Sequence, residues 1–94
     1  MTIKRILCCC GGGIGTSMIE KMNVERCLKK IGITGVDVSQ LSLSEANQSM
    51  CDLIITGKDL FPQVEKWDCK KFYLNNLMDM NEIETKLREA FEIE

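Results

Sequence analysis

The sequence feature that most constrains the fold is a glycine-rich segment, residues 10–17, which reads Cys-Gly-Gly-Gly-Ile-Gly-Thr-Ser. It follows an apolar run at residues 6–9 that is typical of a buried strand, and it precedes a stretch with helical spacing. Four glycines within five residues let the backbone turn sharply and bring several N–H groups toward one point. Converging amides beside a helix N-terminus form an anion site. The segment therefore predicts a phosphoryl-binding loop between a strand and a helix.

The rest of the chain alternates strand and helix patterns. Short apolar or β-branched runs predict strands at residues 3–9, 36–41, 52–56 and 71–74. Helices are expected from residue 17 onward, within residues 42–48, within residues 58–67 with Pro62 in the first turn, and at the C-terminal end. With right-handed crossovers this order gives an α/β fold, a four-stranded parallel sheet flanked by helices on both faces, doubly wound and Rossmann-like. Ligands bind such folds beyond the carboxyl ends of the strands, where residues 10–17 fall.

Helix ends are marked by capping signals. Ser17 and Glu20 have the spacing of a capping box, in which each side chain accepts a hydrogen bond from an amide of the first turn, so the first helix is expected to begin at Ser17. Gly32 is a plausible C-cap for the same helix. Asp79 or Asn81 can cap the last helix.

The composition limits the class of protein. With 94 residues, the chain is long enough for one domain, residues 1–94, and too short for two cores. A net charge of −2 provides no basic surface for nucleic acid. No apolar segment is long enough for membrane insertion or typical of a signal peptide. We therefore expect a cytoplasmic domain without a bound cofactor.

The chain has six cysteines and no histidine. Three cysteines are consecutive and three are isolated, which favours reduced thiols over a disulfide framework. Consecutive cysteines also lack the spacing of a zinc site, so no metal site is expected. The absence of histidine excludes any mechanism in which this chain supplies its own histidine base or phosphohistidine.

Cys10 is the candidate nucleophile because it adjoins the glycines. A thiolate attacks phosphorus, and a helix N-terminus with converging amides lowers the pKa of a thiol. The competing interpretation is that Cys10 is a small buried apolar residue, as many free cysteines are. The glycines and the hydroxyls of Thr16 and Ser17 favour the nucleophile. Cys8 and Cys9 alternate along the strand and are expected to be packing residues.

Three other phosphate loops differ from this segment. A Walker loop ends in Gly-Lys-Ser or Gly-Lys-Thr, and no lysine precedes Thr16 or Ser17. A dinucleotide fingerprint placed on Gly11 and Gly13 lacks its third glycine at Thr16. A cysteine-dependent phosphatase loop would carry arginine at that same position. Without a guanidinium to clamp the phosphoryl charge, the loop fits a phosphoryl carrier better than a hydrolase.

The residues of this region resemble a known family. Arg5-Ile6-Leu7, residues 10–19, Lys21-Met22 and Val24 are similar to the IIB component of the phosphoenolpyruvate-dependent sugar phosphotransferase system, in its ascorbate and galactitol branch. Residues 52–55 and 76–78 agree more loosely. The cysteines at positions 8 and 9, and the glycines and isoleucine of the loop, depart from the ascorbate pattern.

The resemblance implies a phosphoryl carrier. Cys10 would accept a phosphoryl group from a phosphohistidine of the IIA component and pass it to an ascorbate- or galactitol-like sugar bound to the membrane IIC component. The phosphoryl oxygens would be held by residues of the loop, namely Gly11, Gly12, Gly13, Ile14, Gly15, Thr16 and Ser17. The alternative function is a non-catalytic module that binds a phosphorylated ligand, or regulates, through the same loop.

Residues near the loop also bear on docking. Ile14, Met18 and Met22 are candidates for an apolar rim that contacts the two partners in turn, since methionine adapts to different surfaces. For Met22, a place in the core is an equally good alternative, because its spacing also fits the apolar stripe of the helix.

Overall fold

Four parallel strands lie at the centre of the structure, a computed structural model that describes residues 3–9, 14–76 and 78–92. The strands are β1 (Arg5–Cys9), β2 (Asp37–Gln40), β3 (Leu53–Gly57) and β4 (Lys70–Leu74), in the spatial order β2-β1-β3-β4. All neighbours pair in parallel. The predicted strand positions are confirmed to within a few residues at each end. The apolar runs that form β1 and β3 are the two central strands, and the more polar β2 lies at an edge, as its alternation indicates.

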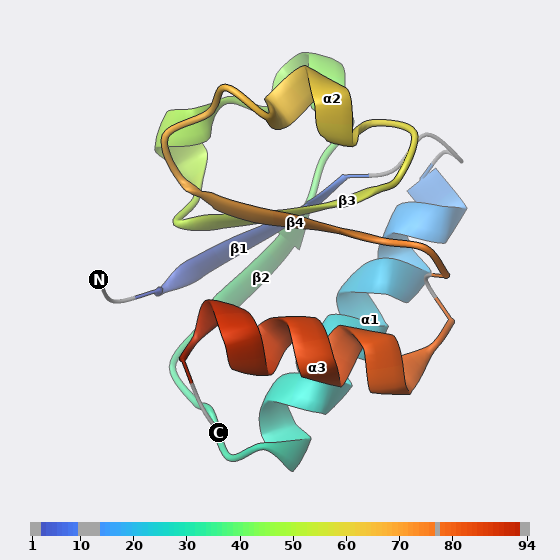
Figure 1. Cartoon of the computed structure of the whole chain (residues 1–94), viewed down its shortest axis with the longest axis vertical. Coiled ribbons are helices and arrows are strands. Elements are labelled where there is room, and N and C mark those ends of the chain that lie inside the picture. Colours follow the sequence, from blue (N-terminus) through green and yellow to red (C-terminus); the bar gives the residue numbers. More distant parts are fainter. Residues whose placement is uncertain (1–2, 10–13, 77, 93–94) are drawn as a thin grey trace.

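Helices cover both faces of this sheet (Figure 1). Helices α1 (Ile14–Lys30) and α3 (Met80–Ala90) lie on one face and contact each other. On the other face lie the short helix α2 (Phe61–Val64) and two 3-10 turns, η1 (Leu43–Glu45) and η2 (Gln48–Met50). The predicted α/β fold with a parallel sheet and helices on both sides is confirmed.

Each face has its own core. The face under α1 and α3 contains the larger one, in which side chains of β1 and β3 pack against Val24, Leu28, Ile83 and Leu87. The face under α2 contains a smaller core, formed by Leu7, Cys9, Cys51, Ile54 and Val64. Ile83 and Leu87 lie one helical turn apart on α3, and both are fully buried.

The end of α1 confirms the predicted role of Gly32. The Ile33 N–H donates to the Leu28 carbonyl oxygen at 2.9 Å, and the Gly32 N–H donates to that of Lys29 at 3.2 Å. This pair of bonds is the Schellman arrangement, which requires a positive φ at the residue after the cap. Gly32 has a φ of 84°. Glycine accepts this conformation without steric cost.

The start of α3 distinguishes between the two predicted caps. Asp79 is the N-cap, because its Oδ1 accepts hydrogen bonds from the backbone N–H groups of Asn81 at 3.0 Å and Glu82 at 3.2 Å. Asn81 lies inside the first turn. The side chain of Asp79 therefore satisfies two of the N–H groups that a helix start leaves without intrahelical partners.

The two short helices predicted after β2 and after β3 have different outcomes. Residues 42–48 do not form an α-helix; the chain there makes η1 and then η2, with Asn47 accepting a hydrogen bond from the Ser49 N–H at 2.9 Å. Asparagine and serine side chains compete for backbone groups and favour such turns over α-helix. Pro62 lies in the first turn of α2, a short helix of one turn, as predicted.

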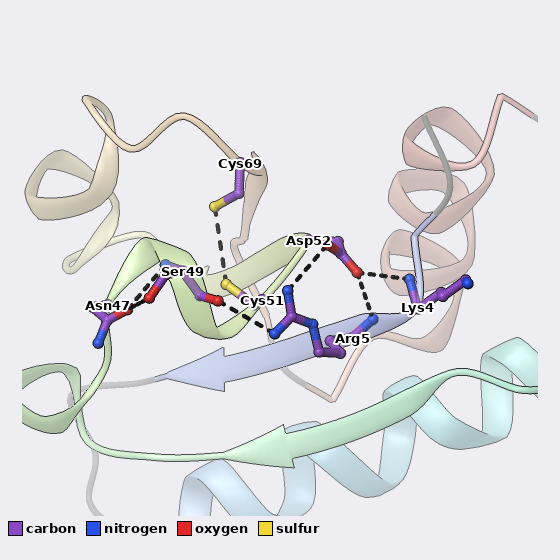
Figure 2. Close-up of polar contacts among 7 residues, drawn as sticks. All are labelled: Lys4, Arg5, Asn47, Ser49, Cys51, Asp52 and Cys69. Atoms are coloured by element: carbon purple, nitrogen blue, oxygen red, sulfur yellow. Dashed lines mark hydrogen bonds and ion pairs between the residues drawn. The ribbon is translucent and has the colours of Figure 1, made fainter.

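Asp52 joins the amino ends of β1 and β3 (Figure 2). Its Oδ2 accepts hydrogen bonds from the backbone N–H groups of Lys4 at 2.9 Å and Arg5 at 3.0 Å. The Arg5 guanidinium lies 3.5 Å from Oδ1 and also donates to the Ser49 carbonyl oxygen. The Lys4 N–H, followed by the contacts from Arg5, lowers the pKa of Asp52. The carboxylate is therefore held ionised at the start of both central strands.

Candidate functional site

The predicted phosphoryl-binding segment lies at the carboxyl end of the central strand β1. Strand β1 ends at Cys9, and α1 begins at Ile14. Cys10, Gly11, Gly12 and Gly13, which fall between them, lie outside the described residues. Ile14, Gly15, Thr16 and Ser17 form the backbone of the first turn of α1. The predicted juxtaposition of strand end, glycine segment and helix start is therefore present.

The predicted capping box is wrong. Ser17 is not the N-cap, because α1 begins three residues earlier, at Ile14. Glu20 does not reach back toward the start of the helix; it points inward and its side chain is fully buried. Helix α1 therefore begins within the glycine-rich segment 10–17 and not at its end. Its first turn carries no acidic residue, which leaves the positive end of the helix dipole without a negative side chain of that turn.

Cys8 and Cys9 are packing residues, as the strand alternation predicts. Cys8 is buried in the core under α1, and Cys9 is buried in the core under α2. Neither thiol is exposed to solvent. Two of the three consecutive cysteines thus have their side chains in the interior of the sheet sandwich, where a phosphorylated partner cannot reach them.

Glu20 is the residue near this site that the sequence pattern placed wrongly. Apart from the nearby Cys8 thiol, neither oxygen of its carboxyl group has a hydrogen-bond partner among the described residues. Burial raises the pKa of Glu20 from 4.5 to about 8, and the hydrogen bond from Cys8 opposes that rise. Glu20 is therefore predominantly neutral at pH 7, and α1 carries no buried negative charge beside the strand end.

Two further buried polar atoms lie at the carboxyl ends of the neighbouring strands. Gln40 pairs with Cys8 in the β1–β2 register, and Thr56 pairs with Cys9 in the β1–β3 register. Gln40 Oε1 and Thr56 Oγ1 are buried without a hydrogen-bond partner within the part of the chain that the structure describes. Buried polar atoms are usually satisfied, and exceptions gather at functional sites. The position of Thr56 at the end of an apolar strand is the signal that could have identified it from the sequence.

The outer side of α1 is apolar close to the site. Met18, Ile19 and Met22 are exposed to 48%, 42% and 45%. The alternative that Met22 belongs to the core is therefore wrong. Met18 and Met22 are both exposed, as the predicted rim requires, and their contact with partners stays a prediction. The side chain of Ile14, the third residue of the predicted rim, lies outside the described part of the structure.

A separate hollow of about 510 Å³ lies against the edge strand β4 and α3. Lys70, Lys71, Lys86 and Tyr73 are among its lining residues, which include no cysteine. Lys70 and Lys71 each donate to a backbone carbonyl oxygen at 2.6 Å, and the Lys86 ammonium lies 5.9 Å from the centre of the Tyr73 ring. This hollow therefore lacks a thiol, and its lysine side chains make contacts within the fold.

The described residues contain neither a metal-binding cluster nor a membrane-spanning helix. In residues 3–9, 14–76 and 78–92, no three or more cysteine, aspartate or glutamate side chains come together in a group that could hold a metal ion. The helices of these same residues include none with the length and apolar character needed to cross a membrane.

Comparisons with known proteins agree with this architecture. Residues 5–89 match the family described as "PTS system, Lactose/Cellobiose specific IIB subunit". The ascorbate-specific PTS system EIIB component of Mycoplasma pneumoniae is 33% identical over 84 residues, which are 87% of this chain and 88% of that protein. The lactose-specific IIB component domain of the phosphotransferase system from Streptococcus pneumoniae superposes with a TM-score of 0.65 over 97% of both chains, at 14% identity, and so shares the fold. The chain therefore belongs to the IIB subunit family of the sugar phosphotransferase system and is a phosphotransferase.

Proposed function

We propose that this chain carries a phosphoryl group on Cys10 between a IIA component and a sugar bound to a IIC component. The observation that carries the proposal is the position of Cys10, the first residue after the central strand β1, four residues before α1 begins. Anions bind at such a junction because helix N-terminal amides and the helix dipole point toward it.

The chemistry needs two displacements at phosphorus. In the first, the Cys10 thiolate attacks the phosphohistidine of the IIA component; an S–P bond forms, the P–N bond breaks, and the histidine nitrogen retains the electron pair. In the second, a sugar hydroxyl attacks the phosphocysteine; an O–P bond forms, the S–P bond breaks, the sulfur keeps the electron pair as a thiolate, and the hydroxyl proton passes to solvent. Both steps depend mainly on positioning and on stabilisation of the phosphoryl charge.

Three features of the chain support this role for Cys10. Cys8 and Cys9 are buried, so Cys10 is the cysteine of the run that remains as the nucleophile. The chain contains no histidine, so a phosphohistidine donor must come from another protein. The carboxyl group of Glu20 is predominantly neutral at pH 7, so it does not oppose the approach of a phosphoryl anion to the strand end.

The proposed sugar is of the ascorbate or galactitol kind. Support comes from the relative in Mycoplasma pneumoniae, whose name states ascorbate specificity and which aligns with most of this chain. The family description instead names lactose and cellobiose. Sugar phosphorylation by membranes that contain a matching IIC component distinguishes these possibilities: we expect product from ascorbate or galactitol, and product from lactose or cellobiose alone would overturn the assignment.

Mass spectrometry tests the role of Cys10. After incubation with phosphoenolpyruvate and the upstream components, the chain should gain one phosphate, located by fragmentation of the tryptic peptide 6–21 at Cys10. Cys10→Ser should gain no thiol-bound phosphate, whereas the matched control Cys27→Ser should behave like the unmodified chain. Phosphate on Cys8 or Cys9 would contradict the proposed site. An unphosphorylated chain that binds inorganic phosphate would instead support the alternative of a non-catalytic binding module.

A further inference from the structure

Cys51 and Cys69, which the proposed phosphoryl chemistry does not use, contact each other at the amino ends of β3 and β4 (Figure 2). The Sγ atoms of Cys51 and Cys69 are 3.9 Å apart, although 18 positions separate the two residues in the sequence. Cys51 lies two residues before β3, and Cys69 lies directly before β4. Because β3 and β4 pair in parallel with Leu53 opposite Lys70, the register of the sheet itself brings the two thiols together.

The two thiols differ in exposure. Cys51 is buried in the core under α2, with 4% of its surface exposed. Cys69 packs against the same core but is only half-buried. A reagent in solution should therefore react with Cys69 before it reacts with Cys51. The sulfur atoms need to approach from 3.9 Å to the S–S bond length of about 2.05 Å, a movement within the range of side-chain rotation.

We propose that Cys51 and Cys69 are a dithiol that forms an intramolecular disulfide by exchange with a low-molecular-weight disulfide such as oxidised glutathione. In the first step the Cys69 thiolate attacks one sulfur of the reagent, a mixed disulfide forms, and one glutathione thiolate leaves. In the second step the Cys51 thiolate attacks the Cys69 sulfur, and the second glutathione thiolate leaves. The two protein thiols lose two electrons and two protons, and the reagent gains both as two molecules of reduced glutathione.

The environment of Cys51 sets the character of this bond. Burial first, and then the neighbouring Cys69 thiol, raise the pKa of the Cys51 thiol well above its usual range. A thiol of high pKa is a slow attacking group because little of it is thiolate at neutral pH, and it is also a poor leaving group when a disulfide is attacked. The second step should therefore be slower than the first, and the finished disulfide should resist reduction.

The pair is independent of the proposed phosphoryl site. Cys51 and Cys69 precede β3 and β4, at the amino ends of the strands, whereas Cys10 follows β1 at its carboxyl end. A disulfide here would close a loop that contains β3 and α2, and it would leave the glycine-rich segment unchanged. Oxidation at this edge should therefore stabilise the fold without removing the Cys10 thiol.

Tryptic mapping tests the proposal cleanly, because the cysteines fall in different peptides. Cys51 is the only cysteine of peptide 31–58, and Cys69 is the only cysteine of peptide 67–70. The whole chain is reduced, treated with oxidised glutathione, and its remaining thiols are alkylated before digestion. We expect peptides 31–58 and 67–70 as one linked species, with a mass two hydrogen atoms below the sum of the two reduced peptides. A lasting glutathione adduct on Cys69 without the linked species would overturn the proposal.

Variants separate this pair from the other thiols. Cys69→Ser should not give the linked species, and Cys51→Ser should stop at the mixed disulfide on Cys69. Cys27→Ser, which removes a buried thiol of the other core, should retain the linked species. A disulfide that maps to peptide 6–21, which holds Cys8, Cys9 and Cys10, would contradict the assignment. Oxidised unmodified chain should also melt at a higher temperature than reduced chain, and Cys69→Ser should show no such difference.

Discussion

Helices α1 and α3 pack on the same face of the sheet and contact each other, yet their glutamate side chains differ in burial and in ionisation. Helix α1 buries Glu20 completely, with the Cys8 thiol as its nearby polar neighbour, and burial raises the pKa of that carboxyl group to about 8. Helix α3 keeps Glu82 and Glu84 only partly buried and gives both of them partners. The same side chain is therefore a neutral group in one helix and an ionised group in the other.

The acids of α3 stabilise its start and its contact with α1. Partial burial raises the pKa of Glu82, but hydrogen bonds from Asn75 and Asn76 outweigh this effect and hold that pKa below its usual value. Glu84 accepts a hydrogen bond from Arg88, and the Lys30 ammonium of α1 lies 2.9 Å from its other oxygen. These contacts lower the pKa of Glu84.

The two helix starts differ in the negative charge that their own side chains provide. The first turn of α3 contains Glu82 and is capped by Asp79, so its own side chains provide the negative charge. The first turn of α1 contains no acid. A phosphoryl group at the start of α1 would therefore meet no competing carboxylate from that turn, whereas one at the start of α3 would meet two.

The largest expected effect concerns Glu20 and pH. The carboxyl group titrates near pH 4.5 when the chain is unfolded and near pH 8 when it is folded, so between these values the folded state holds one more proton. Its contribution to stability is fully present below pH 4.5 and is lost as the pH rises toward 8, with a slope of about 1.4 kcal/mol per pH unit. Glu20→Gln should remove this slope from the free energy of unfolding, measured by urea titration between pH 5 and 8.

The exposed Glu25 of the same helix provides the matched control. Glu25→Gln should leave the pH slope of the unmodified chain unchanged. Equal slopes for Glu20→Gln and the unmodified chain would mean that Glu20 is ionised in the fold, and the contrast between α1 and α3 would then fail.

An intermediate effect, on the rate of phosphorylation, is expected when an acidic residue is placed in the first turn of α1. At an effective dielectric constant of about 20, two unit charges about 6 Å apart repel by about 3 kcal/mol, which is about a hundredfold in rate. Thr16→Glu should therefore slow phosphorylation of the chain by roughly that factor. The same change should raise the melting temperature slightly, because an acid in the first turn favours the helix.

A variant that is phosphorylated more slowly but melts at a higher temperature is not misfolded, so this combination identifies repulsion by the added charge as the cause. Thr16→Gln, which is neutral and of the same size as glutamate, should slow phosphorylation much less. A Thr16→Glu chain that is phosphorylated at the normal rate would show that the phosphoryl group does not bind near the start of α1.

The smallest effect is expected at the start of α3. Asp79→Ala removes the acceptor of two backbone N–H groups and should lower the free energy of unfolding by about 1 kcal/mol. Asp79→Asn retains an acceptor and should lose much less. Neither change should alter the rate of phosphorylation, since Asp79 lies at a different helix start. A slower rate would mean that the two helix starts are not independent.

The fold was largely predictable because its signals are local. The apolar runs of β1 and β3, the glycine at position 32 and the choice of Asp79 or Asn81 each depend on a few adjacent residues. The start of α1 was placed three residues too late because Ser17 and Glu20 match a capping box. That local pattern competed with burial of Glu20 against the sheet, and tertiary packing determined the outcome.

The candidate site was less predictable than the fold. The sequence alternation placed Cys8 and Cys9 in the interior, and the structure confirms it. Thr56 carries a local signal, as a polar residue at the end of an apolar strand, but the place of Gln40 beside β1 depends on the register between strands and could not be predicted. The role of Cys10 stays a prediction, for which phosphate mapping is the test.

The contacts of Asp52 have a consequence for the opposite end of the sheet. A strand is nearly inextensible, with a rise of about 3.3 Å per residue, so fixing one end of it also fixes the other. Asp52 accepts hydrogen bonds from the Lys4 and Arg5 amides and so fixes the amino end of β1. The position of the carboxyl end, at Cys9, is thereby fixed as well. Under the proposed function, the carboxyl end of β1 is then held in the same place for both partner proteins, by contacts at the other end of the strand.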